Sequence, residues 1–266
     1  MTSYLEDDKN LRRCLKSLIN QTYRWLEIII VFEPNDINFK ILKNEYSNFD
    51  NIIFIQNRIK MGFVKSLNYA IKQSSSNFIA RIDSDDYCDL RRFEIQKKFL
   101  DLNPNVGVLG SNMTLIDEKG KKIGERIYKE NHHEIKNSFL FQSGIAHPSV
   151  IIRKDIIKRF GAYDDNFLFA EDIELWLRFL RNKVNFHNIN ENLVFYQVKS
   201  FSEKRPSAHW KFNLKARTRH NFYVYNILLS SFSILAFSLI CLFPNVLFDN
   251  KILNGFVNRI KSKSKI

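Results

Sequence analysis

The first third of the chain alternates between helical spacing and β-branched runs, and this alternation constrains the fold more than any other feature. Apolar residues recur three and four positions apart from residue 11 to residue 19, which predicts one buried helix face. The run 26–32, with three consecutive isoleucines, is typical of a strand covered on both faces. Residues 51–55 predict a second such strand, and residues 64–71 return to helical spacing.

A third strand is predicted at Phe78-Ile-Ala-Arg-Ile82, and it ends in an acidic burst, Asp83-Ser-Asp-Asp86. Strands that alternate with helices need crossover connections, so the pattern predicts an α/β fold with a mostly parallel central sheet flanked by helices. Ligands of such sheets bind beyond the carboxyl ends of the strands. The acidic burst therefore marks the candidate site.

The pattern changes beyond residue 105. Residues 106–125 predict a β-hairpin that turns around Gly120, and residues 149–152 predict another short strand. Helical spacing returns over about 171–182. The first turn of that helix holds Glu171 and Asp172, where the helix dipole favours negative charge.

The net charge of +13 is concentrated at the end of the chain. From Lys199 onward there are twelve Lys and Arg against two acidic residues, so ten of the thirteen positive charges lie in this tail. A basic tail predicts a polyanionic partner. Because no nucleic-acid-binding motif is present, we expect an anionic membrane surface and no nucleic acid.

The same tail contains an uncharged, apolar segment. Residues 222–243 are apolar enough for a single membrane-spanning helix, but basic residues flank both ends and Asn226, Ser230 and Ser233 form a polar stripe. A helix that lies in the membrane interface fits at least as well. The chain opens without a signal peptide, and its three cysteines lack metal-ligand spacing. We therefore expect attachment to the cytoplasmic face of the inner (plasma) membrane.

The carboxylates of Asp83 and Asp85 can lie on one side of a turn and bind a hard cation such as Mg²⁺ or Mn²⁺. Such an ion stabilises the negative charge of a leaving diphosphate. Taken alone, however, an acidic pair of this kind is more often a helix cap. The surrounding motifs have to decide between these interpretations.

Six motifs, in order between Asp8 and Tyr196, resemble those of the family 2 glycosyltransferases of the GT-A fold. They are Leu11-Arg-Arg-Cys-Leu-Lys-Ser-Leu-Ile-Asn-Gln-Thr-Tyr23, Glu27-Ile-Ile-Ile-Val31, Ile79-Ala-Arg-Ile-Asp-Ser-Asp-Asp86, Arg92-Phe-Glu-Ile-Gln96, His147-Pro-Ser-Val150 and Ala170-Glu-Asp-Ile-Glu-Leu-Trp-Leu-Arg178. The chain is most similar to members that build bacterial lipopolysaccharide, O-antigen or capsule chains. The resemblance implies inverting, metal-dependent transfer of a sugar from a nucleotide-sugar donor to a saccharide or lipid-linked acceptor.

The resemblance also implies roles for individual residues. Asp83 would approach the donor ribose or diphosphate and the metal, and Asp85 would bind the metal. Asp172 matches the catalytic base, and Glu171 would support the base or contact the acceptor. A first-turn carboxylate that only stabilises its helix remains the alternative for Asp172.

Three further residues match family positions less closely. Glu33 falls where the family contacts the donor base, although this chain has Phe-Glu-Pro-Asn where the family has Asp-Asp-Gly-Ser. Arg81 either reaches the donor diphosphate or pairs with the nearby carboxylates. His147 has the family's His-Pro context and is a candidate for the acceptor side or for a structural role.

The N-terminus departs from the family pattern. A GT-A domain opens with an apolar strand, whereas Met1 already lies in the turn that follows that strand, so we expect the first strand to be missing and Met1 not to be the ancestral start. We expect a GT-A domain over residues 1–198 and an apolar, helical, membrane-associating appendage over residues 199–266. A catalytically impaired relative and a basic membrane-binding protein without enzymatic activity remain the alternative functions.

Overall fold

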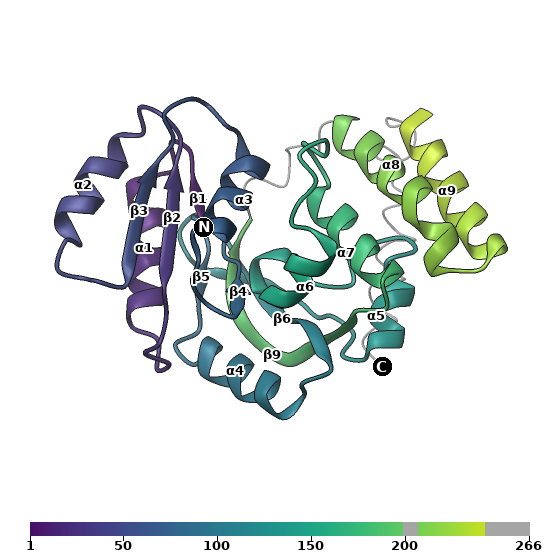
Figure 1. The fold of residues 1–266 in the computed structure, drawn as a ribbon, viewed down its shortest axis with the longest axis horizontal. Helices are drawn as coiled ribbons and strands as arrows, with labels where there is room; N and C mark the ends of the chain where they lie inside the picture. The colour runs from purple at the N-terminus through teal and green to yellow at the C-terminus, as the bar shows by residue number, and fades with distance from the viewer. Residues whose placement is uncertain (199–206, 243–266) are drawn as a thin grey trace.

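The computed structural model describes residues 1–198 and 207–242. Within these ranges the chain forms two β-sheets that are covered by helices (Figure 1). The described part of the predicted appendage lies at the opposite end of the molecule from the first sheet. Residues 199–206, which include the expected domain boundary, and the basic residues 243–266 lie outside the description.

The first sheet is parallel throughout, in the order β1-β2-β3, as the alternating pattern predicts. All five residues of β2 are buried, which confirms the strand covered on both faces. The crossovers contain α1, whose buried residues include Leu11, Cys14, Leu15 and Leu18, and α2. Helix α3, with Val64 and Leu67 buried, follows β3 and leads to the second sheet. The elements of this half are β1 (Thr2–Ser3), α1 (Asp8–Ile19), β2 (Ile28–Phe32), α2 (Ile37–Glu45), β3 (Ile52–Gln56) and α3 (Phe63–Gln73).

The first strand is short and not absent, which corrects the expectation from the sequence. Thr2 and Ser3 pair in parallel with Val31 and Phe32 of β2. The Met1 carbonyl accepts a hydrogen bond from Val31 N at 3.1 Å, so the residue before the strand also joins the ladder. The family resemblance placed these residues in the turn after the strand, and a two-residue strand is too short to show a period.

The second sheet is mixed, in the order β4-β8-β6-β9-β5, with β7 paired to β6. β4 pairs antiparallel with β8, whereas β6 runs parallel to β9. The predicted hairpin is confirmed as β6 and β7. The strands are β4 (Phe78–Ala80), β5 (Tyr87–Cys88), β6 (Val106–Ile116), β7 (Lys122–Arg126), β8 (Ile151–Arg153) and β9 (Asn185–Gln197).

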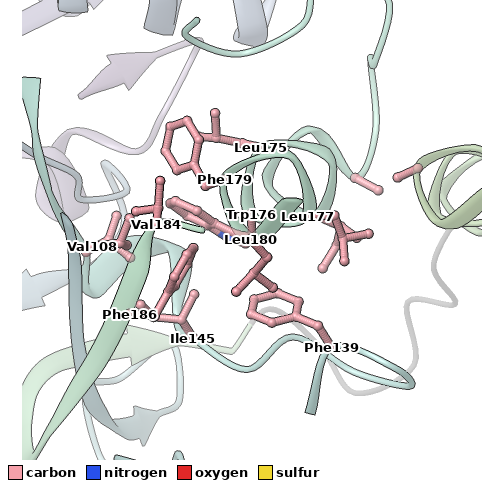
Figure 2. Close-up of a cluster of buried hydrophobic side chains, with 14 of the residues drawn as sticks. Val108, Phe139, Ile145, Leu175, Trp176, Leu177, Phe179, Leu180, Val184 and Phe186 are labelled. Carbon is pink, nitrogen blue, oxygen red and sulfur yellow. The ribbon is translucent and has the colours of Figure 1, made fainter. Parts of the chain in front are cut away.

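Helix α7 (Glu171–Arg181) packs on this second sheet through the larger hydrophobic core. Trp176 is fully buried, and Figure 2 shows its indole beside Val184 and Phe186 from the neighbouring strand region. The apolar face that anchors α7 thus fixes the direction of its N-terminal carboxylates. The remaining helices are α4 (Arg92–Leu102), α5 (His132–Ser138), the 3₁₀ turn η1 (His147–Ser149) and α6 (Lys154–Phe160).

The apolar segment of the tail is broken into two helices, α8 (Ser207–Val224) and α9 (Ile227–Leu242). The Asn226 side chain accepts a hydrogen bond from Leu229 N at 2.9 Å and so starts a new helix inside the predicted span. Helix α8 packs against α7, with Ala216 and Val224 in the same core as Trp176. Among the helices of the described ranges, none has both the length and the apolar character that a membrane crossing requires.

Candidate active site

Three aspartates meet in the loop that follows β4. Asp83, Asp85 and Asp86 each offer a carboxylate oxygen within 4.8 Å of the others. The loop is fixed from two sides, because Arg13 Nη2 of α1 donates to the Asp85 carbonyl at 2.9 Å and Gln197 N of β9 donates to Asp86 Oδ1 at 2.9 Å. A rigid cluster of hard oxygen donors fits Mg²⁺ or Mn²⁺.

Asp86 is the member of this cluster for which the sequence predicts no site role. It is fully buried, and no hydrogen bond from the described residues reaches its Oδ2. Burial raises the pKa of Asp86 well above its usual range, and the charges of Asp83 and Asp85 add to the rise. A buried, unpaired carboxylate oxygen is costly unless a cation or a proton neutralises it. The chemistry of this cluster therefore fits a divalent cation, and the acidic burst itself was the signal for Asp86.

Arg81 lies beside the cluster and is buried. Its Nη2 forms an ion pair with Asp83, as one of the two interpretations of the sequence predicted. No described residue accepts a hydrogen bond from its Nε or Nη1. These two buried donors leave Arg81 with capacity for an anionic group such as a diphosphate, in addition to its pair with Asp83.

Glu171 and Asp172 begin α7 on the other side of the site. Ala170 adopts the left-handed conformation with φ 54°, which sets the sharp entry of the chain into the helix. Asp172 Oδ1 accepts a hydrogen bond from Ile173 N at 2.8 Å. Burial raises the pKa of Glu171 to about 8, and the Asp172 charge adds to the rise. The Arg81 charge lowers the pKa of Glu171 and the Asp83 charge raises it, so Glu171 lies within electrostatic range of both groups.

His147 and Tyr163 form a polar pair near Arg81, in which Tyr163 is buried and His147 is half-buried. His147 Nε2 lies 2.6 Å from the Tyr163 hydroxyl, and the imidazole ring packs edge-on against Trp176. Burial lowers the pKa of His147 well below its usual range, and the Arg81 charge adds to the effect. Asn68 of α3 holds the Tyr163 backbone from both sides through its amide. The lowered pKa favours the neutral form of this imidazole, which contacts Tyr163 and Trp176.

The Glu33 carboxylate accepts hydrogen bonds from other residues of the chain in this structure. Its carboxylate accepts hydrogen bonds from Met61 N at 2.9 Å, Gly62 N at 2.7 Å and Ser66 Oγ at 3.0 Å. These donors belong to the N-terminus of α3, where a negative charge is favourable. The role of Glu33 at the donor base stays a prediction, and its observed role is to join the end of β2 to α3.

Comparisons with known proteins identify the family of the chain. Residues 1–161 match the model of the glycosyl transferase family 2. The chain is 32% identical to the O-antigen biosynthesis glycosyltransferase WbnJ of Escherichia coli, over 75% of this chain and 79% of the relative. It is 29% identical to the UDP-Gal:α-D-GlcNAc-diphosphoundecaprenol β-1,3-galactosyltransferase of Escherichia coli, over 77% of this chain and 75% of the relative.

Among solved structures, the chain is similar to residues 1–349 of TarS from S. aureus in complex with UDP-GlcNAc. The TM-score is 0.69 at 18% identity, over 92% of this chain and 71% of that chain. The chain spans 38% of the length of a longer TarS chain. This likeness shows a shared fold, and the family match covers more than half of the sequence. The chain therefore belongs to glycosyl transferase family 2.

Proposed function

We propose that the protein transfers a sugar from a nucleotide-diphosphate sugar to a saccharide or lipid-linked acceptor, with inversion at the anomeric carbon and with help from a divalent cation. The observation that carries this proposal is the cluster of Asp83, Asp85 and Asp86, which faces Arg81 and the acidic N-terminus of α7. The UDP-GlcNAc complex of TarS supports a nucleotide-sugar donor. The lipid-linked substrate named for the galactosyltransferase relative supports the acceptor class.

The donor diphosphate is assigned to the acidic cluster and Arg81. Asp83, Asp85 and Asp86 would hold the cation, which neutralises charge on the diphosphate when bound. The unpaired Nε and Nη1 of Arg81 would donate to diphosphate oxygens. Because Arg81 is buried, its side chain is already held in place before the donor binds.

The acceptor hydroxyl is assigned to the α7 side of the site. The acceptor oxygen forms a bond to the anomeric carbon, and the bond from that carbon to the diphosphate breaks with its electron pair on the leaving group. The Asp172 carboxylate takes the proton of the hydroxyl during the attack. Glu171, whose raised pKa keeps a proton near neutral pH, would donate a hydrogen bond to the acceptor or to Asp172. His147 would support the acceptor side from behind.

The proposal predicts metal-dependent thermal stabilisation by a nucleotide-sugar. The purified full chain is screened against UDP-, GDP- and dTDP-sugars with and without Mn²⁺. One donor class is expected to raise the Tm by roughly 5–10 °C at a hundredfold excess over its Kd, and only with the metal. Radiolabelled transfer to a membrane lipid extract is then measured with that donor.

The outcomes separate the candidate functions. Binding without transfer under any metal would indicate a catalytically impaired relative. No stabilisation by any donor, together with binding to anionic vesicles, would indicate a membrane-binding protein without enzymatic activity.

Helix α9 supports the anionic membrane as a partner, because its polar side chains are buried and its apolar side chains are exposed. Ser230 and Ser233 are fully buried, and Ser233 Oγ donates to the Leu140 carbonyl at 2.6 Å. Leu228, Phe232 and Leu235 instead face outward with 80%, 62% and 58% exposure. A helix on a water-facing surface has the opposite arrangement. We infer that the exposed face of α9 inserts into the membrane interface, with the basic residues of the tail on anionic head groups.

This assignment predicts that Leu228, Phe232 and Leu235 are needed for membrane binding. Changing all three to Ser is expected to lower partitioning into phosphatidylglycerol vesicles by roughly 100-fold or more, because each buried apolar side chain contributes about 1.5–3 kcal/mol. The measurement is vesicle co-sedimentation of the full chain.

A matched triple variant, Ile59, Leu90 and Leu102 to Ser, removes exposed apolar side chains outside α9. It is expected to sediment with vesicles as the unchanged chain does. Equal losses in both triple variants would contradict a specific role for α9.

A further inference from the structure

The loop that enters α7 exposes two large apolar side chains directly before the acidic pair. Leu168 is 66% exposed and Phe169 is 38% exposed. The next residue, Ala170, has the left-handed φ of 54°, and α7 begins after it with Glu171 and Asp172. A residue with a side chain is strained in this conformation, and such strain is typical of functional sites. An exposed apolar pair therefore lies next to the proposed base, on a strained turn.

Helix α8 lies beside α7 and packs against this loop (Figure 1). The centroid of the Phe212 ring of α8 lies 5.9 Å from that of Phe167 and 6.0 Å from that of Phe169. Phe167 is fully buried. These aromatic contacts anchor the loop to α8, so the exposed apolar pair has a defined place beside that helix.

The side of α8 that meets the loop is basic. Lys215 Nζ lies 4.8 Å from the centroid of the Phe167 ring and 5.6 Å from that of Phe212. The Arg219 guanidinium, one helical turn further along α8, lies 5.6 Å from the centroid of Phe167. Cation–π contacts of this kind hold both charges beside the loop.

Both cations have donors for an anionic ligand. Lys215 is exposed, and no ion pair joins it to an acidic side chain of residues 1–198 or 207–242. Arg219 Nη1 pairs with Asp164 at 2.6 Å and lies 3.8 Å from a Glu174 carboxylate oxygen, which leaves the other guanidinium donors for a second acceptor. Two positioned cations beside exposed apolar side chains match a phosphate group that carries an apolar chain.

The acceptor surface consists of Leu168, Phe169, Lys215 and Arg219. We propose that this surface binds the phosphate-linked lipid of the acceptor, an inference that rests on the proposed function. The phosphate or diphosphate accepts hydrogen bonds from Lys215 and Arg219, and the beginning of the apolar chain contacts Leu168 and Phe169. The sugar on that phosphate is then close to Asp172, because a single turn separates the acceptor surface from the start of α7.

Such a surface distinguishes between two classes of acceptor. A free saccharide has neither an anionic group nor an apolar chain, so it gains no binding energy there. A sugar on a lipid phosphate uses both the cations and the apolar pair. The acceptor surface therefore assigns a lipid carrier to the acceptor, which the acidic cluster alone does not specify.

The test uses farnesyl diphosphate as the probe, with farnesol and inorganic diphosphate as the two partial probes. Binding to the purified full chain is measured by titration calorimetry in EDTA, where the metal-dependent binding expected at the acidic cluster is absent. Farnesyl diphosphate is expected to bind at least roughly tenfold more tightly than either partial probe, because it alone reaches both parts of the surface. Equal affinity of farnesyl diphosphate and one partial probe overturns the proposal.

Two variants locate the binding. Lys215→Gln removes a charged donor and Leu168→Ser removes an apolar contact, so each is expected to weaken farnesyl diphosphate binding roughly tenfold or more. The matched controls are Lys98→Gln and Leu102→Ser, which change exposed residues of α4 and are expected to bind the probe as the unchanged chain does. Full affinity in Lys215→Gln and Leu168→Ser, or equal losses in the controls, overturns the proposal.

The membrane is a second source of phosphate on an apolar chain. Lys215→Gln and Leu168→Ser are expected to bind phosphatidylglycerol vesicles as the unchanged chain does, because the proposed membrane contact lies on α9. A loss of vesicle binding as large as the loss of probe binding would show that the surface holds bulk anionic lipid, which overturns its assignment to the acceptor.

Transfer measurements separate this inference from the proposed function. With a membrane lipid extract as the source of acceptor, both variants are expected to raise the extract concentration needed for half-maximal transfer roughly tenfold. An unchanged concentration overturns the acceptor surface and leaves the proposed function intact. If the unchanged chain transfers no sugar, the expected probe binding still supports the surface, and only the proposed function fails.

Discussion

Replacing Asp172 with Asn is expected to lower the rate of sugar transfer by roughly 100-fold or more, while donor binding stays unchanged. The amide keeps the size of the side chain and can still accept the hydrogen bond from Ile173 N, so α7 retains its start. The variant loses the basic carboxylate that takes the proton of the acceptor hydroxyl. The measurements are the single-turnover transfer rate and, separately, the donor Kd.

Asp155→Asn is the matched control, because Asp155 is an exposed acidic residue in the first turn of α6. It makes the same chemical change at a helix start away from the acidic cluster, and transfer is expected to remain at the level of the unchanged protein. If Asp172→Asn weakens donor binding as much as it slows transfer, Asp172 has a structural role and the assigned base is wrong.

Replacing Asp85 with Ala is expected to remove the metal-dependent part of donor binding. Loss of a residue that only supports a metal ligand typically costs 10–100-fold in metal affinity, so loss of a ligand is expected to cost roughly 100-fold or more. The loop itself should persist, because Arg13 Nη2 donates to the Asp85 backbone carbonyl, which the substitution leaves in place. Titration calorimetry with the nucleotide-sugar, at fixed Mn²⁺ and in a chelator, measures the effect.

Asp101→Ala provides the comparison for this variant. Asp101 lies on α4, its side chain is 55% exposed, and it forms an ion pair with Lys97. Its removal should leave the metal dependence unchanged. Full donor affinity in Asp85→Ala with the same dependence on Mn²⁺ would exclude Asp85 as a ligand.

The local elements were largely predictable, because each depends on a period within one segment. The spacing of Leu11, Cys14, Leu15 and Leu18 predicted α1, and the run of isoleucines predicted β2. The hairpin of β6 and β7 and the helix over 171–182 were predicted in the same way. A period carries this information because the burial of one face determines which positions are apolar.

Other features were not predictable, because they depend on neighbours that are distant in the sequence. Asp86 Oδ2 is buried and accepts no hydrogen bond from the described residues. The neighbouring Oδ1 accepts a hydrogen bond from Gln197 N of β9, which is 111 positions away. The break between α8 and α9 arises at Asn226, inside a segment whose hydropathy is continuous. Glu33 matches a donor-contact position in the sequence. In the structure, its carboxylate accepts hydrogen bonds from the backbone amides of Met61 and Gly62 at the start of α3.

The sequence by itself determined the family, the alternation of strands and helices, and the acidic residues of the candidate site, because these are properties of local composition, spacing and order. Only the tertiary structure decided which of these groups meet. It brought Arg81 and Asp83 close enough to the α7 carboxylates for their charges to act on Glu171, and it turned the serines of α9 inward and the leucines outward. The physical reason is that burial, pairing and charge coupling are set by packing between distant segments, and such packing leaves no period in the chain.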